Sequence, residues 1–155
     1  MRLRLTAGGA YNHVMQNKTD IEKLYESFAA RDYEAVMAIF AEDFEWISAD
    51  NSPLADQSPY NGVDEIRSGV FGRIDAGFEK LIVVADEIFE AEGGRVIVLG
   101  YYHGKFRGQT EEFKTQVAHI WTMRDGRAVK FQQYVDTLKI AWDSGEVSKK
   151  RGFRN

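Results

Sequence analysis

The first part of the chain repeats apolar residues with the period of a helix. In residues 17–32, Ile21 and Phe28 fall on one helical face, and Thr19 precedes Glu22 at the spacing of a capping box. This pattern predicts a helix that starts near Thr19 and buries one side. Regular patterning begins only after residue 16.

Two further helices are predicted before the pattern changes. Asp32 is placed to cap a helix over residues 33–41, after which residues 42–48 take the two-residue period of a strand. Residues 49–62 combine both prolines with Asn, Asp and Ser, which predicts an irregular loop. The third helix is expected over residues 63–77.

The second half of the chain has the pattern of β-strands. Gly93–Gly94 and Asp125–Gly126 each separate two apolar runs, and such pairs favour the positive φ angles of tight hairpin turns. The sequence therefore predicts two hairpins, whose strands cover residues 79–92, 95–107, 111–124 and 128–137.

The strand at residues 95–107 is apolar on both faces. Val96 and Val98 alternate with Ile97 and Leu99, so neither face is suited to water. The predicted helices can cover only one face of the sheet. We therefore expect a homodimer in which the other face meets a second copy of the chain.

Composition indicates one ordinary globular domain. The chain has 155 residues, of which 44% are hydrophobic and 13% are aromatic, enough for a single core. We place this domain at residues 17–143. Residues 1–16 are expected to be a flexible N-terminal arm or an upstream extension, and residues 144–155 a basic C-terminal tail.

Charge and residue usage narrow the classes of function. A net charge of −4 gives no field that attracts nucleic acid, and no apolar run approaches the ~20 residues that span a bilayer. The chain has no cysteine, and its histidines, His13, His103 and His119, lack the spacing of a catalytic metal site. We expect a cytoplasmic protein that uses no metal, nucleotide or other cofactor.

Four segments carry a resemblance to a known family. They read LYESFAARDYEAVMAIFAEDFEW, YNGVDEIR, RVIVLGYYHGKFRG and AHIWTMRDGRAVKFQQYVDT, and cover most of residues 19–138. These segments resemble the nuclear transport factor 2-like superfamily, in its branch of SnoaL-like polyketide cyclases and ketosteroid isomerase relatives. The resemblance implies an α+β fold, in which a cone-shaped, curved antiparallel sheet (a cystatin-like α+β barrel) carries three N-terminal helices on its concave face, over an apolar pocket.

Strand parity selects candidate residues for that pocket. His119 shares a face with Trp121, and Gln133 shares one with Phe131, so both polar groups can point into an apolar cavity. Asp136 has the opposite parity and reaches the cavity only if its strand bulges.

Burial lowers the pKa of a histidine and a nearby carboxylate raises it, so such a pair can transfer protons near neutral pH. We therefore predict His119, Asp136 and Asp50 as catalytic residues. Predicted substrate-binding residues are Trp46, Tyr25, Tyr101, His103, Trp121 and Gln133. Packing in the core or exposure at the rim is the alternative for each, and His119 can equally serve as a satisfied core histidine.

The steroid isomerase pattern is incomplete in this chain. By resemblance, Ser48 stands where those isomerases have their catalytic base, Leu24 where they have the oxyanion tyrosine, and His119 where they have the oxyanion acid. The base of those isomerases is a carboxylate, which Ser48 does not supply. This disfavours steroid isomerisation.

Two functions remain open. One is a cofactor-free enzyme that isomerises, cyclises, dehydrates or hydrolyses a hydrophobic oxygenated substrate, with the loop at residues 49–60 as its lid. The alternative is a non-catalytic ligand-binding or dimerisation module of the same fold.

Overall fold

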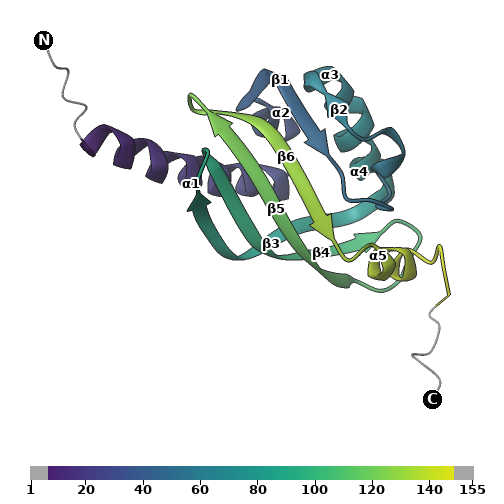
Figure 1. Ribbon diagram of the computed structural model, residues 1–155. Helices are drawn as coiled ribbons and strands as arrows, with labels where there is room; N and C mark the ends of the chain where they lie inside the picture. Colours follow the sequence, from purple (N-terminus) through teal and green to yellow (C-terminus); the bar gives the residue numbers. More distant parts are fainter. Residues whose placement is uncertain (1–6, 149–155) are drawn as a thin grey trace, which may run out of the picture.

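A curved β-sheet wrapped around one side of a helical layer forms the molecule (Figure 1). The computed structural model describes residues 7–148, with side chains from residue 16. Within this range one sheet has the strand order β2-β1-β6-β5-β4-β3. Its strands are β1 (Phe40–Ile47), β2 (Tyr60–Asn61), β3 (Phe78–Ala91), β4 (Arg95–Phe106), β5 (Phe113–Arg124) and β6 (Arg127–Val135).

The predicted α+β fold with a curved sheet is confirmed, with one correction to the strand directions. Neighbouring strands are antiparallel except β1 and β6, which run parallel. A parallel pair needs a long connection between its strands. Here strands β2 to β5 and the helical segment of residues 62–77 lie between β1 and β6 in the chain, so this requirement is met.

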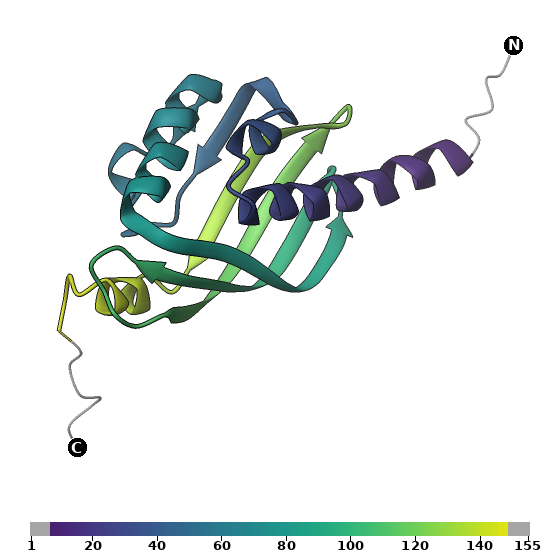
Figure 2. The ribbon, with the colours of Figure 1, turned by 180° about the vertical axis from the view of Figure 1, so that it is seen from behind.

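The helices α1 to α4 lie against the concave face of the sheet, with α1 crossing it (Figure 2). The helices are α1 (Ala7–Ala29), α2 (Tyr33–Met37), α3 (Gly62–Ile66), α4 (Gly72–Gly77) and α5 (Thr137–Asp143). A π-helical turn, Arg67–Phe71, joins α3 to α4 and completes the predicted third helix. Within the described part of the chain, no helix is both long and apolar enough to cross a membrane.

The helices differ from those expected in three places. The first helix begins at Ala7, so residues 7–16 are helical where the pattern predicted no regular structure; residues 1–6 and 149–155 of the predicted arm and tail lie outside the described residues. Helix α2 ends at Met37, earlier than predicted, because Phe40 already pairs with Ala128 of β6. Helix α5 was not predicted.

The two predicted hairpin turns are confirmed. Asp125 and Gly126 have φ angles of 52° and 76°, and Gly93 and Gly94 have 75° and 71°. Such turns hold β3 to β4 and β5 to β6 in register. Register then decides which side chains meet inside the molecule.

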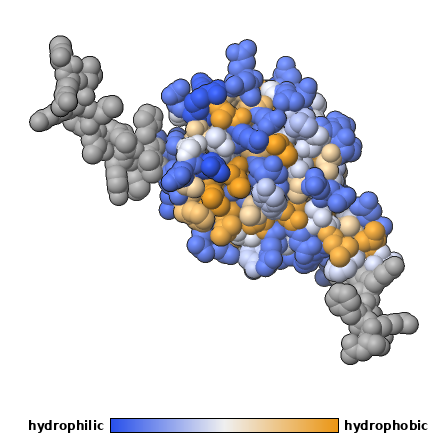
Figure 3. All heavy atoms as spheres, viewed as in Figure 1, coloured by the Kyte–Doolittle hydropathy of each residue, from blue (hydrophilic) through white to orange (hydrophobic). Residues whose placement is uncertain are grey.

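Alternate residues of β4 and β5 are buried against the helices. In β5 and β6, His119 lies opposite Gln133 and Trp121 opposite Phe131, all on this buried face. The remaining residues face away from α1, where Figure 3 shows apolar residues among polar ones over the sheet.

Candidate functional site

An apolar cavity lies between the helices and the concave face of the sheet. The volume of this cavity is about 60 Å³. Among the described side chains, its lining has no Asp, Glu, Lys or Arg. Its polar groups come from Tyr25, Ser52, Tyr102, His119 and Gln133, besides the indoles of Trp46 and Trp121. A bound molecule would therefore meet aromatic and aliphatic walls with a few uncharged hydrogen-bonding atoms.

The polar groups form a chain centred on His119. Its Nδ1 is hydrogen-bonded to the hydroxyl of Tyr25 at 2.7 Å, and its Nε2 to the hydroxyl of Tyr102 at 2.9 Å. The imidazole is 2% exposed and touches the edge of Phe131. Since α1, β4 and β5 each supply one member, only the folded sheet and helix bring these groups together.

Two further donors fix the tyrosines in place. The Trp121 indole Nε1 donates to Tyr25 Oη at 2.8 Å, and Gln133 Nε2 donates to Tyr102 Oη at 2.7 Å. Gln133 is oriented in turn by the backbone N–H of Ala49, which donates to its Oε1 at 3.0 Å. The chain of hydrogen bonds thus runs from α1 to the start of the loop after β1.

All side chains in this hydrogen-bonded series are uncharged at neutral pH. Burial lowers the pKa of His119 to about 3, so its ring is a neutral imidazole. Burial also raises the pKa of Tyr25 and of Tyr102 well above the ordinary value, so both phenols keep their protons. A histidine with so low a pKa is a weak proton acceptor at pH 7.

The loop after β1 covers one end of the cavity with Ser52, Pro53 and Leu54. Arg73 of α4 holds this loop, because it donates to Asp56 Oδ1 and to the Pro53 carbonyl, both at 2.8 Å. The hydroxyl of Ser52 is buried without a hydrogen-bond partner among the described residues. It is a further polar atom at the cavity.

Five of the residues predicted for the site line the cavity. His119 and Gln133 point inward as strand parity indicated, and Tyr25, Trp46 and Trp121 form its walls. The hydrogen bonds that Tyr25 makes with Trp121 and His119 give it a specific role that its place in a helical stripe did not indicate. Helical spacing shows the face of a residue but not the partner that it meets across the core.

The predicted carboxylates are not brought to His119. Asp136 is exposed and serves as the N-cap of α5, where it accepts from Lys139 N at 3.0 Å, and Asp50 is exposed in the loop after β1. Both ring nitrogens of His119 are occupied by tyrosines instead. The reason is geometric, since the chain turns into α5 at Asp136 and no bulge there rotates its side chain inward.

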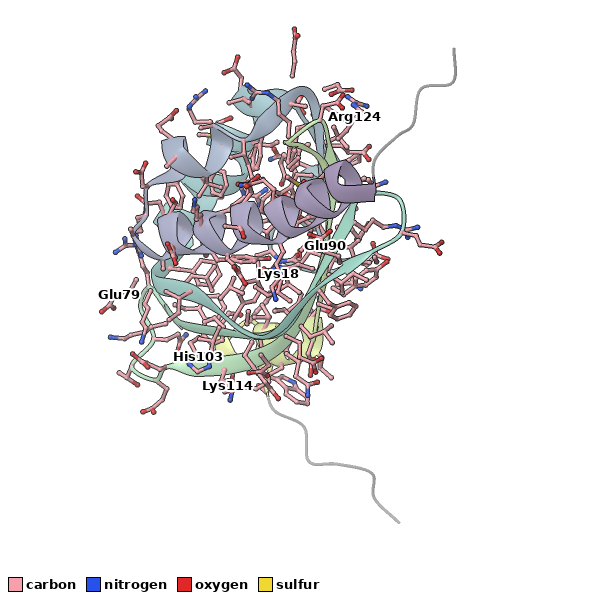
Figure 4. The ribbon with its side chains drawn as sticks, turned by 90° about the vertical axis from the view of Figure 1, so that its left-hand side faces the viewer. Lys18, Glu79, Glu90, His103, Lys114 and Arg124 are labelled. Atoms are coloured by element: carbon pink, nitrogen blue, oxygen red, sulfur yellow. The ribbon has the colours of Figure 1, made fainter. Side chains whose placement is uncertain are left out.

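Tyr101 and His103 lie on the outer face of the sheet and not in the cavity. Tyr101 stacks under the ammonium of Lys114, which lies 4.0 Å from the ring centre. Figure 4 shows His103 beside Lys114, its partner in the neighbouring strand. The sequence analysis missed Tyr102 as a residue of the site. Tyr102 has the same strand parity as Val98, which is buried and pairs with His119 of β5, so Tyr102 also faces inward.

Fold and site define a small α+β domain with a cone-like sheet that closes over an apolar, uncharged cavity. The model of one family, described as SnoaL-like domain, matches residues 21–131. The chain therefore belongs to the SnoaL-like domain family.

Solved structures support the same fold. An NTF2-like protein from Burkholderia thailandensis E264 is 30% identical, with a TM-score of 0.74 over 82% of this chain and 95% of its own. TerC, co-crystallised with polyporic acid, is 23% identical, with a TM-score of 0.73 over 84% of this chain and 98% of its own. A putative SnoaL-like polyketide cyclase from Jannaschia sp. CCS1 is 17% identical, with a TM-score of 0.68 over 92% and 96%. A comparison with curated proteins found no match.

Proposed function

We propose that this protein binds a small, uncharged and largely apolar molecule in the cavity and holds an oxygen of that molecule at the Tyr25–His119–Tyr102 chain. The observation that carries the proposal is a cavity whose polar atoms are all uncharged, most of them in one hydrogen-bonded chain around a buried imidazole. Apolar walls supply affinity, and the few polar atoms fix the orientation of the ligand.

The absence of charge among the lining residues restricts the ligand. An ionised carboxylate or ammonium would leave water without meeting an opposite charge, which costs several kcal/mol or more. A carbonyl or hydroxyl oxygen can regain its hydrogen bond from a phenol. Neutral oxygenated molecules are therefore favoured over their ionised analogues.

The size of the cavity also restricts the ligand. About 60 Å³ is far below the roughly 300–1,000 Å³ of pockets that enclose drug-sized ligands. Only a ligand smaller than benzene, which occupies a cavity of about 150 Å³, fits as the cavity stands. A six-membered ring requires the loop after β1, with Ser52, Pro53 and Leu54, to move. TerC, which shares the fold, was co-crystallised with polyporic acid.

A second candidate function is catalysis on a carbonyl group. A phenolic donor beside neutral His119 can stabilise negative charge that develops on a carbonyl oxygen. His119 is then a hydrogen-bonding group and not a base, because burial depresses its pKa. A reaction that removes a proton would need its base from the substrate or from water.

The binding proposal is tested by measuring the affinities of cyclohexanone, methylcyclohexane and cyclohexanecarboxylate. Binding is monitored through the fluorescence of Trp46 and Trp121, which line the cavity. We expect cyclohexanone to bind about fivefold more tightly than methylcyclohexane, as one net hydrogen bond of about 1 kcal/mol implies. The carboxylate should bind most weakly. Equal or tighter binding of the carboxylate would refute the proposal, as would failure of all probes to bind.

Adjacent valines provide a matched pair of variants. Val83 lines the cavity, whereas Val84 is 38% exposed on the other side of β3. Val83→Phe should fill the cavity and abolish cyclohexanone binding, and Val84→Phe should leave it unchanged. Loss of binding in both variants, or in neither, would place the ligand elsewhere.

A further inference from the structure

The Tyr25–His119–Tyr102 chain carries more hydrogens than its own bonds use. Each phenol and the neutral imidazole have one hydrogen, three in all, and the two bonds within the chain use one each. Trp121 and Gln133 turn N–H groups toward the phenol oxygens, so neither can accept the remaining hydrogen. One phenolic hydrogen is therefore left without a partner among the described residues.

The tautomer of His119 decides which tyrosine carries this hydrogen. With the proton on Nε2, the ring donates to Tyr102 and Tyr25 donates to Nδ1, which frees the hydrogen of Tyr102. With the proton on Nδ1, the roles reverse and the hydrogen of Tyr25 is free. In both states Trp121 donates to the oxygen of Tyr25 and Gln133 to that of Tyr102.

In either state the tyrosine that donates to His119 keeps a free acceptor position. Its oxygen donates to His119 and accepts from one protein N–H, which leaves one of its two lone pairs unused. Both tyrosines line the cavity. The pair therefore presents one O–H donor and one oxygen acceptor, and a tautomer change exchanges their places.

We propose that the cavity selects a neutral ligand with a hydrogen-bond acceptor at one end and a donor at the other, such as a hydroxyketone, and that His119 adopts the tautomer that matches the ligand's orientation. This rests on the proposed function and specifies its ligand class. The two tyrosine oxygens are separated by about the length of one imidazole and its two hydrogen bonds, and the oxygens of a 1,4-substituted six-membered ring can bridge this gap through hydrogen bonds of their own.

Three cyclohexanones of similar size test the ligand class by calorimetry: 4-hydroxycyclohexanone, cyclohexane-1,4-dione and 4-methylcyclohexanone. We expect the hydroxyketone to bind about fivefold more tightly than either of the others, since it alone satisfies both tyrosines. Equal binding of the three would overturn this inference and leave the proposed function intact. If none of them binds, the proposed function itself has failed.

Tyrosine variants locate the preference. Tyr25→Phe and Tyr102→Phe should each remove the advantage of the hydroxyketone over the dione, because one of its two groups then lacks a partner. Tyr101→Phe, at the neighbouring position on the outer face, should retain the full advantage. An advantage that survives in both cavity variants would contradict the inference.

The tautomers are observed by ¹⁵N NMR of His119 in a His13→Gln, His103→Gln background. We expect both ring nitrogens to give shifts between the protonated and unprotonated limits. Because an orphaned buried N–H is less tolerated than an orphaned acceptor, Tyr102→Phe should move the proton toward Nδ1 and Tyr25→Phe toward Nε2. One unchanged tautomer in all three proteins would refute the switch.

Discussion

At the scale of residues, His119 couples the site to the stability of the fold. Its ring is buried and neutral, because burial lowers its pKa from the ordinary value of 6.5 to about 3. In the unfolded chain His119 binds a proton below about pH 6.5, whereas in the folded chain it binds one only near pH 3. The free energy of unfolding therefore decreases as the pH falls through this window. The ionisable groups that touch the ring are Tyr25 and Tyr102, which remain uncharged there.

We predict that protonation of His119 in the unfolded chain lowers the free energy of unfolding by about 2 kcal/mol as the pH falls from 7 to 5. Urea denaturation at several pH values measures this loss. The variant His119→Gln, whatever its overall stability, should show a dependence on pH that is shallower by that amount. An identical dependence in both proteins would mean that the imidazole already accepts a proton in the folded state.

The sequence predicts single residues of the site as far as strand parity can. His119 and Gln133 were correctly predicted to face inward because their neighbours Trp121 and Phe131 are apolar at the same parity. Tyr102 was missed because two tyrosines are adjacent in a strand that is apolar on both faces, so parity alone cannot tell which one faces inward. The register between β4 and β5, which sets Val98 opposite His119, decides it.

At the scale of elements, the end of β6 explains why Asp136 does not serve the cavity. Its carboxylate caps α5 and satisfies the backbone N–H of Lys139. Helix α5 then places Ile140 in the cavity wall. A short helix after the last strand leaves only weak periodicity in the sequence, and its capping residue was interpreted as a catalytic acid.

We predict that Asp136→Ala lowers the unfolding free energy by about 1 kcal/mol, the usual effect of losing an N-cap. The affinity for cyclohexanone should change less than twofold, because the carboxylate points away from the cavity. Thermal unfolding and fluorescence titration measure the two effects. Asp136→Asn, which retains a capping oxygen, should keep most of the stability; a strong loss of binding in Asp136→Asn would show that the charge itself serves the ligand.

At the scale of the whole molecule, the fold was predictable because its signals are redundant. Helical spacing, two hairpin turns and strand alternation agree with one another across residues 19–138. The parallel pairing of β1 with β6 was not predictable from these signals, since it joins strands about eighty residues apart and no local pattern records which edge of the sheet β1 meets.

The outer face of the sheet has the size and character of an interface between two copies of the chain. Strands β3 to β6, of 9 to 14 residues, form a face of roughly 20 by 40 Å, comparable with the ~800 Å² per partner of a standard interface. Ile97 and Ile120 face each other there, and Phe89 and Val84 are exposed. We propose that this face pairs with itself in a homodimer, which covers apolar side chains that the helices cannot reach.

Light scattering after gel filtration tests this assembly. We predict a mass of twice 17.7 kDa for the protein and of 17.7 kDa for Ile120→Lys, since the buried lysines of both copies would have no opposite charge to meet. Ala30→Lys adds the same charge after α1, away from this face, and should leave the dimer intact. A monomer at every concentration, with cyclohexanone binding preserved, would mean that the cavity functions in a single chain; dissociation by Ala30→Lys would instead move the interface to the helical side.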